Sequence, residues 1–178
     1  VRVAGFDETQ AEWEQLLPRC PSNTIFVTPT WQRVWWQCFG NESGPLLLSL
    51  YDDGETLGIA PLMRKNGTIG FLGDTDLFDY HDFLVPRGKE ADFYPALWDG
   101  LMEMNWRELV LRSLPEGSPT LSYLPALVER TGLELEVVKL QGFRRSMLWK
   151  DTGLLWNPPS PNIRTARAAL AYPAFGLI

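Results

Sequence analysis

Two dipeptides, Asp53-Gly54 and Asn66-Gly67, constrain the fold of this chain more than any other feature. Both are favoured in the two-residue turn of a β-hairpin, where the backbone needs positive φ angles. Strand-like runs flank these turns at residues 46–51, 56–64 and 68–72. The pattern therefore predicts three consecutive antiparallel strands with very little loop between them, and so a sheet at the centre of the fold.

Helical patterns precede and follow these strands. Thr28-Pro29 predicts a helix start, because proline at the first helical position loses no hydrogen bond, and apolar spacing continues to Gly40. Asp7 and Gln10 have the spacing of a capping box and predict an earlier helix. The other expected elements are a strand at 1–6, helices at 7–17, 90–105 and 118–132, and strands at 82–85, 109–114, 133–140 and 144–149. This order predicts an α/β (α+β) fold of three layers, with helices flanking a mixed, mostly antiparallel sheet.

Charge and composition exclude several classes of protein. With 45% hydrophobic residues, eight Trp and nine Phe, the 178-residue chain is expected to fold around one ordinary core. A net charge of -6, without any run of Lys or Arg, argues against nucleic acid as a partner. No apolar run approaches the ~20 residues that span a bilayer, so no membrane span is expected. Cys20 and Cys38 match no zinc or redox motif, which favours a reduced, cytoplasmic setting and no metal site.

A series of short motifs resembles one known family. The motifs are Phe26-Val27-Thr28-Pro29-Thr30-Trp31, Gly58-Ile59-Ala60-Pro61-Leu62, Phe71-Leu72-Gly73, Asp79-Tyr80-His81-Asp82 and Leu111-Arg112-Ser113-Leu114-Pro115. Over residues 25–140 they resemble the cellulose-biosynthesis acetyltransferases, a CelD/BcsL-like family of the GNAT superfamily that is related to the Fem aminoacyl transferases.

This resemblance implies a GNAT-like (acyl-CoA N-acyltransferase-like) fold and the N-terminal, acceptor-side half of an acyltransferase. In such a family the acyl donor is bound mainly by a second domain. The resemblance therefore implies that acetyl-CoA or another acyl-CoA is a co-substrate rather than a tightly bound cofactor. It also implies that the chain needs a missing C-terminal GNAT domain. The expected reaction transfers an acetyl or acyl group to an amine on a small molecule or glycan.

The loop that would bind the donor within this chain is poor in backbone donors. A pyrophosphate is held by several free N–H groups at a helix N-terminus. Here Pro86 removes one such group and Glu90 adds negative charge in the first turn of the helix. Arg87, Gly88 and Lys89 remain as candidate cofactor-binding residues.

The last part of the chain has a different character. Asn157-Pro158-Pro159-Ser160-Pro161 and an Ala-rich stretch at 166–171 do not resemble the family's continuation. We therefore expect a GNAT-like domain at residues 1–150 and an irregular tail at 151–178. The hypothesis for this tail is a truncated or frameshifted reading frame.

The densest polar cluster supplies the candidate catalytic residues, Asp79, Tyr80, His81 and Asp82. Carboxylates around a histidine, whose pKa is near neutrality, could orient an amine acceptor or take its proton. The alternative is that this Asp-rich loop only caps backbone N–H groups and is solvated. A single histidine without paired spacing is a poor metal motif.

Trp36 and Arg64 are the candidate substrate-binding residues. Trp31 and Trp35 follow the apolar stripe of their helix, which predicts core positions. Trp36 lies off that stripe, so we expect it to be the exposed one of the three and to meet a ligand or partner. Arg64 ends the second strand of the predicted meander.

Three hypotheses for function remain at this point. The first is an acyltransferase half that is inactive without its second domain. The second is a non-catalytic, degenerate GNAT module that binds or forms a homodimer through an exposed sheet edge or aromatic surface. The third is a complete small acetyltransferase that binds CoA through residues 87–91.

Overall fold

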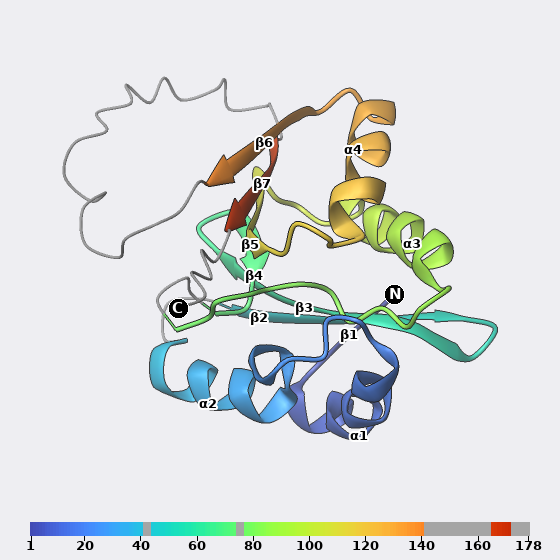
Figure 1. Ribbon diagram of the computed structural model, residues 1–178, viewed down its shortest axis with the longest axis vertical. Helices are drawn as coiled ribbons and strands as arrows, with labels where there is room; N and C mark the ends of the chain where they lie inside the picture. Colours follow the sequence, from blue (N-terminus) through green and yellow to red (C-terminus); the bar gives the residue numbers. More distant parts are fainter. Residues whose placement is uncertain (41–43, 74–76, 141–164, 172–178) are drawn as a thin grey trace, which may run out of the picture.

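The computed structural model describes residues 1–40, 44–73, 77–140 and 165–171. Within these ranges the chain forms one seven-stranded sheet with helices on both faces (Figure 1). The strands are β1 (Arg2–Ala4), β2 (Gly44–Asp52), β3 (Glu55–Lys65), β4 (Thr68–Phe71), β5 (Glu108–Leu114), β6 (Glu134–Leu140) and β7 (Thr165–Ala171). The helices are α1 (Phe6–Leu16), α2 (Pro29–Phe39), α3 (Glu90–Met102) and α4 (Thr120–Arg130), with short 3₁₀ turns η1 (Leu17–Arg19) and η2 (Ile25–Val27). A mixed α/β fold is confirmed.

The meander forms as its turn dipeptides predict. The two central residues have positive φ in both turns, 45° and 84° at Asp53-Gly54 and 51° and 80° at Asn66-Gly67. Such angles match the turn to the right-handed twist of the strands it joins. The strands β2, β3 and β4 pair antiparallel right up to these turns.

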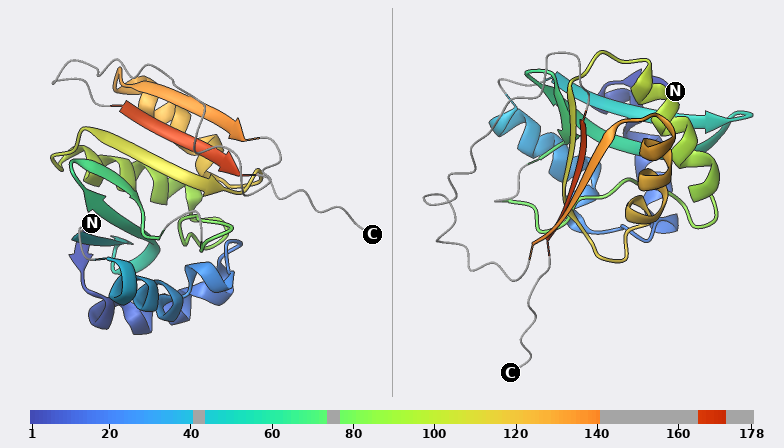
Figure 2. Two further views of the ribbon diagram at one scale, coloured as in Figure 1. Left: turned by 90° about the vertical axis from the view of Figure 1, so that its left-hand side faces the viewer. Right: turned by 90° about the horizontal axis from the view of Figure 1, so that it is seen from above.

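The strand order is β1-β2-β3-β4-β5-β7-β6. Pairing is antiparallel from β1 to β4 and parallel from β4 through β5 and β7 to β6. Parallel neighbours need a long crossover connection, and α3 supplies one between β4 and β5. Figure 2 shows β5, β6 and β7 running in the same direction. The GNAT-like form of this topology stays a prediction.

The ends of the first two helices differ in how they are capped. Thr28 caps α2 as predicted, because its hydroxyl oxygen accepts a hydrogen bond from the backbone N–H of Trp31 at 3.3 Å. The capping box predicted for α1 is wrong, since that helix begins at Phe6 with Gly5 as its N-cap and no side-chain cap. The Gln10 side chain instead donates to Glu14 at 2.9 Å.

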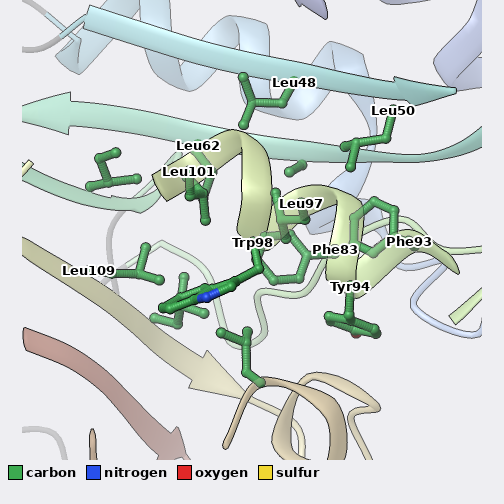
Figure 3. Packing of buried hydrophobic residues seen from close by; sticks show 14 of the residues in the cluster. Leu48, Leu50, Leu62, Phe83, Phe93, Tyr94, Leu97, Trp98, Leu101 and Leu109 are labelled. Atoms are coloured by element: carbon green, nitrogen blue, oxygen red, sulfur yellow. The ribbon is translucent and has the colours of Figure 1, made fainter. Parts of the chain in front are cut away.

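Two hydrophobic clusters fill the layers on either side of the sheet. Alternate residues of β2 point to opposite faces, so Leu48 and Leu50 join one cluster and Leu47 joins the other. The first cluster packs the sheet against α3 and α4, as Figure 3 shows for Leu62, Phe83, Phe93, Tyr94, Leu97, Trp98, Leu101 and Leu109. The second packs α1 and α2 below the sheet through Trp13, Leu16, Trp35, Ile59, Phe78 and Leu84.

Residues 82–85 were predicted to form a strand, but they form only an isolated β-bridge. Leu84 makes an isolated bridge to Ile59, with both N···O distances 2.9 Å. The strand β3 has 11 residues and β4 only four, so part of the β3 edge is left for this segment to pair with. Gly58 allows the approach, because a Cβ there would lie 2.5 Å from the carbonyl oxygen of Leu84.

Several predictions fall at the end of the chain. The possible strand at 144–149 and the domain boundary at residue 150 lie outside the described residues, so the domain division stays a prediction. Residues 165–171 form β7, between β5 and β6. In the described part of the chain, no helix combines the length and the apolar character that a membrane crossing needs.

Candidate functional site

The candidate site lies where β4 and β5 end. These strands are parallel, so their carboxyl ends lie at one edge of the sheet. The segment after β4 crosses this edge, and the backbone N–H of His81 donates to the carbonyl oxygen of Ser113 at 3.0 Å. We call residues 77–83 and 113–120 the β4–β5 edge. In open α/β sheets, ligands bind at the carboxyl ends of strands.

Asp82 is the centre of a buried hydrogen-bond network at this edge. Its Oδ1 atom accepts from the Thr120 hydroxyl at 2.8 Å and from the Phe83 backbone N–H at 2.9 Å. The Thr120 hydroxyl is also 2.9 Å from the Tyr94 hydroxyl. Ser118 accepts the backbone N–H of Thr120 at 3.1 Å and hydrogen-bonds to the Asp82 carboxyl group. The network joins the segment after β4 to the start of α4.

Burial decides the protonation of Asp82. Loss of solvation raises the pKa of its carboxyl group above the usual value, and the hydrogen bonds from Ser118, Thr120 and Phe83 only partly oppose this. The carboxyl group therefore keeps its proton to a higher pH than an exposed aspartate. With 6% of its surface exposed, Asp82 holds the edge together and does not reach a ligand directly.

His81 is part of an aromatic stack. Its ring lies nearly parallel to Phe71, with centroids 5.5 Å apart, and to Phe78, with centroids 4.6 Å apart. A Cβ atom built on Gly73 would lie 2.8 Å from Nε2 of the histidine. With 3% of its surface exposed, His81 belongs to the interior.

The four predicted catalytic residues therefore divide into two pairs. His81 and Asp82 are buried, whereas Asp79 is exposed and Tyr80 is half-buried. Their spacing in the sequence suggested one polar cluster in a loop. The structure brings them to one edge of the sheet, but it turns only the first pair into the interior. A catalytic role for any of the four stays a prediction.

Ser113 has an unusual backbone at this edge. Its φ is 59°, a left-handed conformation that costs a residue with a side chain about 1–2 kcal/mol. The residue is buried, and it lies at an irregularity of β5 between Leu111 and Leu114. This turn directs the Ser113 carbonyl group to the N–H of His81.

The strain at Ser113 gives a testable expectation. We expect Ser113→Gly to have a free energy of unfolding about 1 kcal/mol higher than Ser113→Ala, because only glycine adopts this φ without strain. Urea denaturation of the two variants measures the difference. Equal stability of the two would contradict a strained backbone, since both lack the hydroxyl group.

The predicted substrate-binding residues lie elsewhere. Trp36 is half-buried and packs against the hydrophobic cluster under α1 and α2. Gly40 ends that helix beside it, since a Cβ there would lie 2.5 Å from the Trp36 ring. Arg64 is exposed and pairs with Ile69, so it lies near the amino end of β4. The structure does not bring Trp36 and Arg64 to the β4–β5 edge, and their roles stay predictions.

The residues considered for donor binding are already engaged. The backbone N–H of Gly88 donates to the Glu90 carboxylate at 2.7 Å, and the Lys89 ammonium group lies 3.0 Å from Glu55. The Lys89 backbone N–H donates to the carbonyl oxygen of Pro86 at 3.1 Å. Arg87 is exposed. Binding of a phosphate here would have to displace these partners, and the expectation of acyl-CoA as co-substrate stays untested.

The described residues also include possible metal ligands and two cysteines. Among the described residues, no group of three or more His, Cys, Asp and Glu side chains is arranged to hold a metal ion. Burial raises the pKa of the Cys20 thiol to about 12, so this residue is poorly suited to act as a nucleophile. Cys38 is exposed at the end of α2.

Sequence reasoning missed the partners of Asp82. Ser118 was predicted only as a helix start, and Thr120 and Tyr94 were not singled out. The hydrogen bond between Thr120 and Asp82 joins residues 38 positions apart. Local spacing carries no signal for such a contact.

Comparison with protein families gives a match in the same part of the chain. Residues 120–167 match the family model described as "Exo-beta-N-acetylmuramidase NamZ, N-terminal". The match covers about a quarter of the chain, and it includes α4, β6 and the first residues of β7. Neither the curated proteins nor the solved structures give a match.

This match overturns the family expected from the sequence. The matched family is described as a muramidase, so the GNAT resemblance, the acyltransferase function and the link to cellulose biosynthesis are wrong, and the degenerate GNAT module is not supported. The quoted motifs misled for a physical reason. Thr28-Pro29 starts a helix, and Gly58 allows a close backbone contact. Both are local structural features that occur in many folds.

Proposed function

We propose that this chain is a glycan-acting domain of the exo-β-N-acetylmuramidase type, which engages an N-acetylmuramyl residue at the β4–β5 edge. The observation that carries the proposal is the family match over residues 120–167. The match begins at Thr120, whose hydroxyl group hydrogen-bonds to the buried Asp82. The matched segment therefore starts within the candidate site.

The position of the edge supports this proposal. The loop between β5 and α4 follows the carboxyl end of a parallel strand, where binding sites of α/β proteins are found. The buried network around Asp82 fixes this loop to the segment after β4. A fixed pair of loops on a rigid sheet can hold a ligand in one geometry.

Most glycoside hydrolases use a pair of carboxyl groups that flank the glycosidic bond. The β4–β5 edge offers Asp79 and Glu116, both exposed, on the two segments that the bond between His81 and Ser113 joins. We assign to Asp79 and Glu116 the role of the two carboxyl groups at the glycosidic bond. Asp82 is assigned a positioning role, because it holds the two segments of the edge together. Glu116 was not among the candidates from the sequence.

Hydrolysis of a chromogenic β-N-acetylmuramide by the whole chain tests the proposal. We expect release of the chromophore, and we expect Asp79→Asn and Glu116→Gln each to lower kcat by at least about a hundredfold, the usual effect of losing a general acid or base. Asp92→Asn is the matched control, because Asp92 is an exposed carboxylate in the first turn of α3. It should leave kcat unchanged.

Binding is measured beside hydrolysis, by calorimetric titration with N-acetylmuramic acid. Binding together with the expected loss of activity in both edge variants supports the proposal. If the chain neither hydrolyses the β-N-acetylmuramide nor binds N-acetylmuramic acid, the proposed function is wrong. Equal activity in the Asp79, Glu116 and Asp92 variants would remove the carboxyl assignment.

A further inference from the structure

Three buried polar atoms near the β4–β5 edge have no hydrogen-bond partner among the described residues. They are Oγ1 of Thr24, the indole Nε1 of Trp31 and the amide Oε1 of Gln32. By contrast, the indole N–H of Trp13 donates to the carbonyl oxygen of Val27 at 2.8 Å. Because buried polar groups almost always have a partner, these exceptions call for an explanation.

Trp31 and Gln32 both lie beside Phe26. The Trp31 ring meets the Phe26 ring edge-on, with centroids 5.8 Å apart. The Gln32 amide nitrogen donates to the Phe26 carbonyl oxygen at 3.2 Å, which fixes the amide group and leaves its Oε1 atom as an acceptor. The two side chains that carry the unpaired donor and the unpaired acceptor therefore both contact Phe26.

Aromatic rings connect Phe26 and Trp31 to the β4–β5 edge. Phe78 lies between the two, with ring centroids 6.0 Å from Phe26, 6.1 Å from Trp31 and 4.6 Å from His81. His81 in turn stacks on Phe71, the last residue of β4. The rings thus continue from the sheet edge to the start of α2.

The outer side of this aromatic cluster is accessible. Phe26 and Trp31 are half-buried, so part of each side chain meets solvent. The neighbouring side chains Ile25 and Leu77 are 59% and 45% exposed. A ligand that reaches Trp31 therefore meets an apolar surface before it meets the polar atoms behind it.

We propose that the surface formed by Phe26, Trp31 and Gln32 is a subsite for the acetamido group of an N-acetylated sugar. The inference rests on the proposed function, which supplies the N-acetylmuramyl ligand. An acetamido group offers one N–H donor and one carbonyl acceptor, and these complement the acceptor Oε1 of Gln32 and the donor Nε1 of Trp31. The exposed parts of Phe26 and Trp31 give the apolar surface against which the sugar ring packs.

Both polar atoms are covered, so entry of the acetamido group requires the half-buried Trp31 ring to shift. The indole N–H resonance of Trp31 reports such a shift. Nitrogen–proton correlation spectra of the whole chain are recorded during titration with N-acetylmuramic acid and, separately, with muramic acid, which lacks the acetyl group. Trp31→Phe assigns the resonance.

We expect the Trp31 indole resonance to move with N-acetylmuramic acid, and we expect muramic acid to bind about tenfold more weakly, the change that one pair of hydrogen bonds produces. Trp31→Phe should lower the affinity for N-acetylmuramic acid by a similar factor. Gln32→Met, which keeps the length of the side chain without its acceptor, should do the same. Val34→Ala is the control on the same helix, because Val34 is 53% exposed, and it should bind as the unmodified chain does.

The outcomes separate this inference from the proposed function. If N-acetylmuramic acid binds while the Trp31 resonance and the affinity of Trp31→Phe stay unchanged, the subsite is wrong and the proposed function stands. Equal affinity for muramic acid also overturns the acetamido assignment. Failure of both sugars to bind removes the subsite. If chromophore release fails as well, the proposed function falls with it.

Discussion

Replacing Asp82 by alanine is expected to lower the free energy of unfolding by about 3 kcal/mol, because it leaves buried hydrogen-bond donors without an acceptor. The Phe83 backbone N–H and the Thr120 hydroxyl group both donate to Asp82 Oδ1. Each buried donor left unpaired costs about 1–3 kcal/mol. Urea denaturation at mildly acidic pH, where the folded chain keeps the proton of Asp82, measures the loss. A change no larger than that of a surface substitution would contradict the network described for this edge.

The same residue predicts a pH dependence of stability. Burial raises the pKa of Asp82 in the folded chain above its unfolded value, so the folded state retains a proton that the unfolded state has already released. The contribution of Asp82 to stability is therefore complete below the unfolded pKa of about 3.9, and it is lost as pH rises through the higher folded pKa.

Asp82→Asn isolates this effect. The asparagine side chain keeps a hydrogen-bonding oxygen and cannot ionise, so the fall in stability with rising pH should be smaller in the variant. Urea denaturation at a series of pH values, from acid to neutral, compares the two proteins. Parallel curves over the whole range would show that Asp82 does not change its protonation on folding.

Truncation of Phe78 to alanine is the second large expected effect, about 3–5 kcal/mol of lost stability. The ring is 1% exposed, and its centroid lies within 6.1 Å of the rings of Phe26, Trp31 and Trp35. Removing it leaves a cavity among rings from η2, α2 and the segment after β4. Thermal and urea denaturation measure the loss, and the near-UV circular dichroism of the surrounding aromatic rings should change with it.

Phe39→Ala is the matched control for this prediction. Phe39 also contacts Trp35, with centroids 6.0 Å apart, but it is 58% exposed at the end of α2. Its truncation should change stability by only about 0.5 kcal/mol, as surface substitutions do. Similar losses in both variants would mean that Phe78 is not the centre of this cluster.

The elements that local chemistry determines could be predicted from the sequence. The turn at Asn66-Gly67 forms because both residues accept positive φ, and α2 begins where Thr28 can cap it. The structure of the segment at 82–85 was harder to predict, because its pairing with β3 depends on how far the neighbouring β4 extends. That length is a property of the sheet and is not encoded in the segment itself.

The candidate site could be predicted only in part. The sequence drew attention to His81 and Asp82, because a cluster of polar residues is visible along the chain. Their opposite surroundings, one within an aromatic stack and the other in a hydroxyl network, depend on Phe71 and Thr120 from distant segments. The family prediction was wrong for a related reason. Short motifs reflect the local conformation of the backbone more than the chemistry of a site.

The position of β7 has a consequence for how this chain folds during its synthesis. The last strand in sequence order lies between β5 and β6, and it is the strand with which β6 pairs in the described part of the sheet. Until residues 165–171 emerge, the nascent chain presents β5 as an open edge, and β6 has no partner to dock on. Such an edge can recruit strands from neighbouring chains. Synthesis of residues 165–171 is thus the step that covers the β5 edge and gives β6 its partner, and β6 then becomes the edge strand of the described sheet.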